Sequence, residues 1–249
     1  WGGVHPTIDP EGCIDYADMV FLGEGEFGLL ELITKMGENQ DYSKIPGLWI
    51  KKDDGRVIKN APAPLNNFLN LVPPNDYDDE NKYYIKNGNL KSGDPYTNDN
   101  ELYTIITGRG CPFDCTYCIN HLFKELYSNR GYPIRRRNVS HVINELSQAK
   151  KIFPNLKRVS IYDDVFVLDK EWAKEFCDEY KEKINLPFSC LFHPSTIKEE
   201  IVSILKEGGL DYIDIGIESG SERIRRDILG RKDSNKVIKK AMNIMHKYN

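Results

Sequence analysis

The stretch Gly110-Cys111-Pro112-Phe113-Asp114-Cys115-Thr116-Tyr117-Cys118 brings three cysteines into eight positions, in the spacing C-x3-C-x2-C. Thiolates at this density bind iron–sulfur clusters or zinc. A cubane cluster needs four ligands, and this loop supplies only three. A cluster held here would leave one iron open, and an open iron can chelate a small molecule.

The cysteine loop follows a predicted strand at 103–107, and beyond it helical and strand patterns alternate. Further strands are expected at 158–162, 188–192 and 212–217. Helices are expected at 139–152, at 172–180, from the capping-box pattern Thr196-Ile197-Lys198-Glu199 to Gly208-Gly209, and at 237–245. Strands separated by helices of about ten to fifteen residues imply parallel, right-handed crossovers, and therefore an α/β fold.

A polar or metal-binding group follows each of the four predicted strands. The cysteines follow the first strand and Asp163-Asp164 the second, whereas His193 follows the third and Glu218-Ser219-Gly220 the fourth. In parallel sheets and barrels the carboxyl ends of the strands share one rim, which carries the chemistry. We therefore expect these groups to converge on an active site, where His193 is either a general acid or base or a structural residue.

The first hundred residues carry a different pattern. A short buried strand at 18–22 leads into Gly23-Glu24-Gly25-Glu26 and a helix, and strands at 48–51 and 57–59 flank the turn Asp53-Asp54-Gly55. Five prolines among many Asn and Asp residues then indicate an interdomain connection. The predicted pieces are residues 1–59, a linker at 60–100, and a catalytic core at 101–249.

Composition and charge narrow the class of protein. The 249 residues carry a net charge of −4, and no apolar run approaches the roughly 20 residues of a membrane span, so we expect none. Arg135-Arg136-Arg137 lacks interleaved aromatics, and we interpret it as a solvated basic stretch with no nucleic-acid partner. Cys13, Cys177 and Cys190 are scattered rather than arranged as a disulfide framework, which, with no secretion signal after Trp1, predicts a reducing, cytoplasmic location.

With Tyr117 in the aromatic place before the last cysteine, the loop resembles the defining motif of the radical S-adenosylmethionine superfamily. The resemblance implies a [4Fe-4S] cluster on Cys111, Cys115 and Cys118, with Tyr117 beside the bound cofactor. It implies that S-adenosylmethionine binds the open iron through its methionyl amino and carboxylate groups. One electron from an external donor such as flavodoxin or ferredoxin would then generate a radical that abstracts hydrogen from a small-molecule substrate.

Two further segments resemble nucleotide-binding motifs of the same family. Asp163-Asp164-Val165-Phe166 resembles the D-D-x-F form of cobalamin-associated members, in which the acidic residues bind the methionyl ammonium, and adjacent carboxylates do repel unless a cation lies beside them. Gly216-Ile217-Glu218-Ser219-Gly220-Ser221 resembles the G-x-E-S-G-S segment, whose carboxylate can accept from ribose hydroxyls. Helix capping by either aspartate, and a plain strand-to-helix turn, are the alternatives. The residues assigned to the nucleotide are Asp163, Asp164, Glu218 and Ser219.

The segments Trp1-Gly2-Gly3-Val4-His5-Pro6-Thr7 and 16–26 resemble the last third of a cobalamin-binding Rossmann-like domain. In that family a Gly-Gly pair and the G-E-G-E turn lie along the nucleotide tail of cobalamin, and glycine allows a large ligand to approach the backbone. The cobalt-ligating D-x-H-x-x-G motif would lie upstream of Trp1. The alternative is a Rossmann fragment that serves only as scaffold. The residues assigned to cobalamin are Gly2, Gly3, Gly23, Glu24, Gly25 and Glu26.

Together the resemblances predict a cobalamin-associated radical S-adenosylmethionine enzyme, in which a partial parallel (β/α) barrel follows the C-terminal part of the Rossmann-like domain. They imply methyl transfer or oxidative cyclisation, and we expect the chain to be an internal piece of a longer protein. One alternative is a zinc-stabilised, non-catalytic binding module completed by His121. The other is the methylthiotransferase branch, which carries three more N-terminal cysteines, whereas only Cys13 precedes the motif here.

Overall fold

The computed structural model describes residues 1–77, 80–93, 95, 100–128 and 134–248. Contacts divide the chain into two compact units, which are described separately. The first unit comprises Trp1–Phe68 and Pro112–Pro133, and the second comprises Leu69–Cys111 and Ile134–Asn249. The predicted division into an N-terminal piece, a linker and a catalytic core follows composition rather than contacts, and it stays a prediction.

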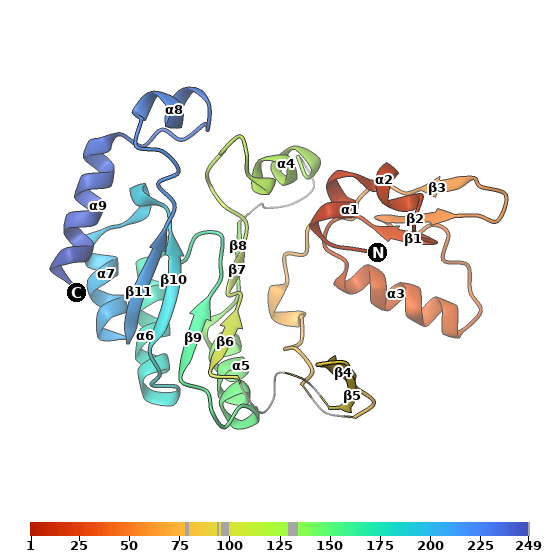
Figure 1. The fold of residues 1–249 in the computed structure, drawn as a ribbon, viewed down its shortest axis with the longest axis horizontal. Coiled ribbons are helices and arrows are strands. Elements are labelled where there is room, and N and C mark those ends of the chain that lie inside the picture. The colour runs from red at the N-terminus through yellow and green to blue at the C-terminus, as the bar shows by residue number, and fades with distance from the viewer. Residues whose placement is uncertain (78–79, 94, 96–99, 129–133, 249) are drawn as a thin grey trace. The chain divides into compact units, whose positions relative to one another are not determined.

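The second unit is built on a four-stranded parallel sheet in the order β11-β10-β9-β6 (Figure 1). Its strands are β6 (Leu102–Ile105), β9 (Arg158–Ile161), β10 (Phe188–Phe192) and β11 (Leu210–Ile215). Four of the five side chains of β10 are buried, as expected for a strand covered on both faces inside a parallel sheet. The predicted α/β fold with a parallel sheet is therefore confirmed.

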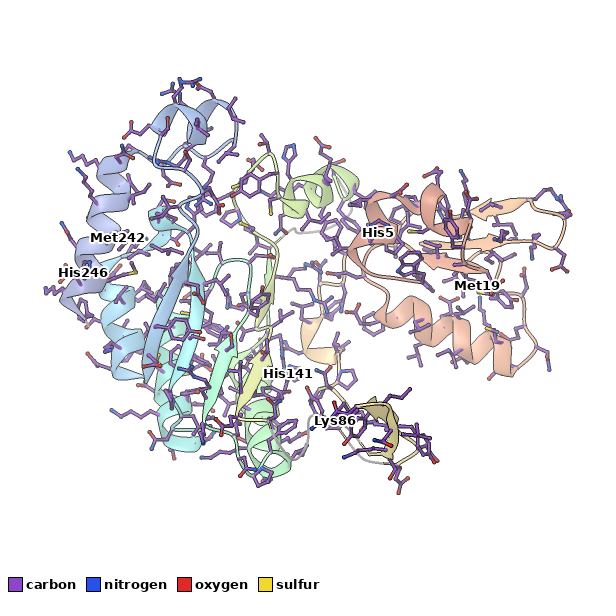
Figure 2. All side chains as sticks on the ribbon, in the orientation of Figure 1. His5, Met19, Lys86, His141, Met242 and His246 are labelled. Atoms are coloured by element: carbon purple, nitrogen blue, oxygen red, sulfur yellow. The ribbon has the colours of Figure 1, made fainter. Side chains whose placement is uncertain are left out.

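Four helices of the second unit follow the predicted alternation. They are α5 (Val139–Ile152), α6 (Lys170–Lys183), α7 (Glu199–Glu207) and α9 (Asn235–Lys247). Helix α5 packs against α6, α6 against α7, and α7 against α9, where Met242 and His246 are labelled (Figures 1 and 2). Their apolar faces and the strands share one core that includes the fully buried Phe166, Phe176 and Phe188.

The predicted capping box before α7 is wrong. The helix begins at Glu199 with Lys198 as its N-cap, and no side chain caps it. Thr196 instead ends a short 3-10 helix, Pro194–Thr196, and its hydroxyl donates to the His193 carbonyl at 2.8 Å. The Thr196 hydroxyl therefore bonds to the preceding turn instead of capping α7. Pro194 favours that turn because its ring fixes the backbone after His193.

A two-residue antiparallel ladder joins β7 (Gly108–Arg109) to β8 (Arg135–Arg136). Gly108 pairs with Arg136, Arg109 pairs with Arg135, and the Arg137 amide donates to the Thr107 carbonyl at 2.9 Å. The strand predicted at 103–107 thus ends at Ile105. The chain then forms a second strand, β7, which pairs with β8 before the cysteines begin. We call residues 107–110 and 135–137 the loop root, because the cysteine loop leaves the second unit there and returns there.

The first unit contains a three-stranded antiparallel sheet in the order β1-β2-β3, which includes the predicted hairpin. Its strands are β1 (Met19–Phe21), β2 (Leu48–Lys51) and β3 (Val57–Lys59), and its helices are α1 (Val4–Ile8), α2 (Pro10–Ile14), α3 (Glu26–Gly37) and α4 (Ile119–Leu126). Buried Val20, Leu22 and Trp49 pack against Cys13 and Ile14 of α2. A second small core forms around Leu32, Ile45, Leu48 and Ile50.

The predicted linker carries little regular structure among its described residues. Leu69–Leu71 form a 3-10 turn, and β4 (Tyr83–Lys86) pairs with β5 (Asn89–Ser92) in an exposed hairpin, on which Lys86 is labelled in Figure 2. Nowhere in the described ranges is a helix both long and apolar enough to cross a membrane.

Candidate active site

The three cysteines of the loop are divided between the units. Cys111 follows the loop root in the second unit, and Cys115 and Cys118 belong to the first. Cys118 is the N-cap residue of α4, and its amide donates to the Cys115 carbonyl at 3.1 Å. Lys124 of α4 reaches back to the Phe113 carbonyl at 2.7 Å, which folds this end of the loop onto the helix.

The donor set fits an iron–sulfur cluster. Three soft thiolates on one short loop are what such clusters bind, and none of the six cysteines, all of which are described, forms a disulfide. No three His, Cys, Asp or Glu side chains in the described residues lie close enough to share a single metal ion. A cubane binds each thiolate at a different iron, so its ligands need not converge on one point. His121, the alternative fourth ligand, faces Glu125 at 3.6 Å along α4.

The remaining cysteines are buried thiols of a different kind. Burial raises the pKa of Cys177 to about 12, with Asp178 and Glu207 adding to the effect. Burial also raises the pKa of Cys190 well above its usual range. A thiol that stays protonated is a poor metal ligand, so neither residue is a candidate ligand of the cluster.

Asp163 lies at the carboxyl end of β9, and only 2% of its surface is exposed. Its Oδ1 accepts from the Thr107 amide at 2.6 Å and from the Gly108 amide at 3.1 Å. Its Oδ2 accepts from the Thr107 hydroxyl at 2.5 Å and lies 3.3 Å from Nη1 of Arg136. Burial raises the pKa of Asp163, and Arg136 together with these hydrogen bonds opposes that rise.

Asp164 is exposed, and it also bonds to the loop root. Its Oδ2 accepts from the Gly110 amide at 3.2 Å, one residue before Cys111. The helix that follows is capped by Asp169, which accepts from the Trp172 amide at 3.0 Å. The alternative that Asp163 or Asp164 caps a helix is therefore wrong.

The interpretation of Arg135-Arg136-Arg137 as a solvated stretch is also wrong. The Arg136 side chain is 21% exposed, pairs with Asp163 and lies over the Trp172 ring at 4.7 Å. The Arg137 side chain is 11% exposed; it pairs with Glu145 at 2.5 Å and donates to His141, which is labelled in Figure 2, at 2.9 Å. Arg136 and Arg137 are thus largely covered and paired with carboxylates of the second unit.

The segment after β11 turns at Glu218, whose φ of +64° lies in the left-handed region. Arg231 lies 3.2 Å from Oε1 of Glu218 and donates to the Gly216 carbonyl at 2.7 Å. A Cβ on Gly216 would lie 2.3 Å from Oε1 of Glu218, so glycine lets the carboxylate take this position without a shift of its side chain. A backbone conformation that glutamate rarely adopts is thus held by a buried arginine.

Ser219 takes part in the turn itself. Its hydroxyl accepts from the Ser221 amide at 3.2 Å, and its carbonyl accepts from Arg225, which is completely buried. Arg225 also donates to the Asp233 carbonyl at 3.1 Å and to Asn235 at 2.6 Å. Ser221 then caps the short helix α8 (Glu222–Asp227). The strand-to-helix turn is therefore present, with Glu218 as its one carboxylate.

His193 is buried at the carboxyl end of β10 and has polar neighbours at both ring nitrogens. Nδ1 lies 2.8 Å from the Ser195 hydroxyl, and Nε2 lies 3.1 Å from Oδ2 of Asp233. Burial lowers the pKa of His193 to about 4, an effect that Asp233 opposes and Arg231 increases. The ring is therefore neutral near pH 7, and these contacts favour the structural role over the acid or base role.

The glycines of the N-terminal piece differ in their surroundings. A Cβ on Gly23, whose φ is +77°, would lie 1.5 Å from the hydroxyl of Tyr127. Gly3, with φ +101°, and Gly25 would meet nothing within 4 Å, and Gly2 only Phe21 at 3.6 Å.

The acidic residues of the same turn lie at the start of α3. Glu24 accepts from the Asn66 amide at 3.1 Å, and Glu26 is the first residue of the helix. Tyr117, the aromatic residue of the cysteine loop, is 51% exposed.

The structure brings the predicted site residues of the second unit together in two separate groups of contacts. One joins Asp163 and Asp164 to the loop root, and the other joins His193 to Glu218 through Asp233 and Arg231. The sequence reasoning missed the partners, which are Thr107, Arg136, Arg225, Arg231 and Asp233. Thr107 lies at the end of the predicted strand 103–107 and Arg231 directly follows Gly230, which are signals that could have identified these two residues. No such signal marks the other three.

Comparison with curated proteins finds three informative relatives. An uncharacterized methyltransferase of Pyrococcus horikoshii is 30% identical over 90% of this chain, and the cytidylyl-2-hydroxyethylphosphonate methyltransferase of Streptomyces wedmorensis is 25% identical over 92%. The anaerobic magnesium-protoporphyrin IX monomethyl ester cyclase of Rubrivivax gelatinosus is 22% identical over 98%. The chain spans 46%, 46% and 42% of their respective lengths, less than half in each case.

Solved structures share the fold. The radical S-adenosylmethionine methyltransferase TsrM of Kitasatospora setae, solved with tryptophan and a cofactor analogue, matches 99% of this chain with a TM-score of 0.72 at 18% identity, over 47% of its own chain. The cobalamin-dependent radical enzyme OxsB, solved with aqua-cobalamin and S-adenosylmethionine, matches 98% with a TM-score of 0.73 at 19% identity, over 34% of its own chain.

A family model matches more than half of the chain directly. It is the model of the radical SAM superfamily, where SAM is S-adenosylmethionine, and it covers residues 105–249. The match begins in β6 and includes the loop root, all three cysteines of the loop, and the segments around Asp163 and Glu218. The chain therefore belongs to the radical SAM superfamily.

Proposed function

We propose that this chain is the cofactor-binding part of a cobalamin-dependent radical SAM enzyme that transfers a methyl group to a small molecule or closes a ring on it. The observation that carries the proposal is the C-x3-C-x2-C loop, which leaves the parallel sheet at the carboxyl end of β6. Chemistry in parallel α/β folds takes place at this end of the strands. Methyltransferases and a cyclase among the relatives support the two reaction classes.

Cys111, Cys115 and Cys118 would hold a [4Fe-4S] cluster as thiolates. When bound, such a cluster supplies one electron to S-adenosylmethionine chelated at its open iron, which yields a carbon radical. The exposed Asp164 would accept from the methionyl ammonium, whereas Asp163 is 2% exposed and already bonded within the protein. Glu218 and the neighbouring Ser219 would contact the ribose, and the exposed ring of Tyr117 would lie beside the nucleotide.

Gly2, Gly3 and the turn at residues 23–26 would face cobalamin. Gly3 and Gly25 support this assignment, because nothing within 4 Å would meet a side chain there. Open space over a glycine allows a large, flat ligand to approach the backbone.

The reaction requires an external electron source, for which flavodoxin or ferredoxin is the proposed donor. A reducing location such as the cytoplasm suits six cysteines of which none forms a disulfide among the described residues.

Anaerobic reconstitution with iron and sulfide tests the cluster. The chain should bind about four irons and turn brown, with a thiolate-to-iron absorbance at about 400 nm. Replacing Cys115 with Ala should remove the colour, whereas Cys177→Ala, at a buried thiol outside the loop, should keep it. A colourless wild-type chain that retains one zinc ion would instead support the zinc-stabilised binding module.

A further inference from the structure

The cysteine loop begins and ends at the loop root, and both sides of the loop root contact one buried carboxylate. Asp163 accepts from the Thr107 and Gly108 amides on the outgoing side, and its Oδ2 lies 3.3 Å from Arg136 on the returning side. With the Thr107 hydroxyl, these donors occupy both oxygens of the carboxylate. Asp163 is therefore an acceptor that the outgoing and returning segments share.

Arg136 is fixed from three directions. Its Nη1 donates to the Thr107 hydroxyl at 2.9 Å as well as contacting Asp163, and its backbone pairs with Gly108 in the β7–β8 ladder. Its guanidinium lies over the rings of Trp172 at 4.7 Å and Phe166 at 5.8 Å. These aromatic contacts hold the returning segment against the core. They also orient the guanidinium, so less conformational entropy is lost when Arg136 pairs with Asp163.

Asp164 extends the same arrangement toward the first cysteine. Its acceptance of the Gly110 amide means that adjacent carboxylates bind the amides of residues 107, 108 and 110. The residue after Gly110 is Cys111. The backbone path to Cys111 is therefore set by two carboxylates that follow the carboxyl end of β9.

We propose that Asp163 and Arg136 are positioning residues that clamp the two ends of the cysteine loop and so hold Cys111 in place for cluster assembly. The inference rests on the proposed function only in taking Cys111 as a cluster ligand. A buried ion pair adds little net stability, but it can select one arrangement of the chain over others. Here the selected arrangement is the pairing register of β7 and β8, in which Gly108 lies opposite Arg136.

The clamp predicts a different result from direct binding of the cofactor by Asp163. Asp163→Asn keeps the size of the side chain, and its remaining oxygen can still accept from the Thr107 and Gly108 amides, but it removes the charge and places an NH2 donor in the position of Oδ2, facing the Thr107 hydroxyl and Nη1 of Arg136. In the clamp, this change should increase hydrogen exchange at the Thr107, Gly108 and Arg137 amides by at least about tenfold, and it should lower iron content after reconstitution. Asp164→Asn should keep iron loading and weaken S-adenosylmethionine binding.

Leu205→Ala provides the matched control, because Leu205 is completely buried and belongs to α7, an element outside the loop root. It should lower the melting temperature while leaving loop-root exchange and iron content per folded chain unchanged. Thr107→Val is a milder second variant that removes only the hydroxyl bonds, and it should raise exchange at Gly108 less than Asp163→Asn does.

Two results would overturn the clamp. In one, Asp163→Asn loads a full cluster with unchanged loop-root exchange and loses only S-adenosylmethionine affinity, which would make Asp163 a cofactor ligand. In the other, Leu205→Ala lowers iron content as much as Asp163→Asn does at an equal loss of melting temperature. If the wild-type chain takes up no iron, the proposed function fails, and the exchange comparison still tests the clamp.

Discussion

At the scale of single residues, Glu218 is distinguished by its backbone. Five non-glycine residues in the described ranges have positive φ, and the other four are asparagines, Asn39, Asn81, Asn87 and Asn185. Asparagine adopts the left-handed region more readily than glutamate does. A glutamate at such a position is therefore explained by its side chain rather than by its backbone, which fits the proposed contact with ribose hydroxyls.

Glu218→Asn separates these two contributions. The variant relieves the backbone but removes the carboxylate, and with it one partner of Arg231, which keeps Asp233. These effects on stability oppose each other, so the melting temperature should change little. S-adenosylmethionine should bind roughly tenfold more weakly, the cost of about one charge-assisted hydrogen bond. Isothermal titration of the reconstituted chain measures this, and unchanged affinity would remove Glu218 from the nucleotide site.

His193 predicts a pH dependence of stability. Its pKa is about 4 in the folded chain, below the value of about 6.5 expected when unfolded. The unfolded chain therefore binds the proton more tightly, so the free energy of unfolding should fall as pH decreases from about 6.5 toward 4. His193→Gln removes this contribution, and its urea midpoint should change less between about pH 7.5 and pH 5 than that of the wild type. Equal pH dependence in both chains would contradict the buried, neutral state of His193.

At the scale of elements, two glycines of the turn between β1 and α3 lie in different surroundings, which explain differently why each position lacks a side chain. Gly23 has positive φ, donates its amide to Thr7 at 2.9 Å, and lies under the hydroxyl of Tyr127, next after α4. Gly25 is the N-cap of α3 and has open space above it. Only the second glycine leaves room above the backbone, as the proposed cobalamin contact needs.

Gly23→Ala should therefore lower the free energy of unfolding by at least about 2 kcal/mol, since it combines backbone strain with a clash against Tyr127. Gly25→Ser is the matched control: serine is a good N-cap, so stability should be unchanged, while cobalamin retention should fall if the ligand packs on this turn. Denaturant unfolding and the cobalamin content of the purified chain measure the two effects. A Gly23→Ala chain as stable as the wild type would contradict this account of the turn.

The longer elements follow from periodicity and the hairpin of β2 and β3 from its turn signal, whereas the β7–β8 ladder follows from neither. The strands at Arg158–Ile161 and Phe188–Phe192 and the helix Val139–Ile152 agree closely with prediction, because apolar spacing over several residues identifies a buried face. The ladder between β7 and β8 has two residues on each side and leaves no periodic signal. Thr196 misled the capping prediction because its hydroxyl bonds locally to His193.

At the scale of the whole chain, what the sequence does not reveal is contact between distant charges. Arg136 and Asp163 are 27 positions apart, and Thr107 and Asp163 are 56 apart. Spacing indicates that carboxylates share a rim, but it cannot show that an arginine from a basic triplet neutralises one of them. Arg136 supplies a cation beside Asp163 from within the protein, and the methionyl ammonium stays a proposal for Asp164.

The central claim is that Cys111, Cys115 and Cys118 hold a cluster with one iron open to S-adenosylmethionine. Electron paramagnetic resonance of the anaerobically reconstituted, reduced chain, recorded before and after adding S-adenosylmethionine, tests it most directly. The account predicts a reduced-cluster signal that changes shape when the cofactor is added, and its loss in the Cys115→Ala chain. A wild-type chain without the signal, or with a signal that S-adenosylmethionine leaves unchanged, would contradict the claim.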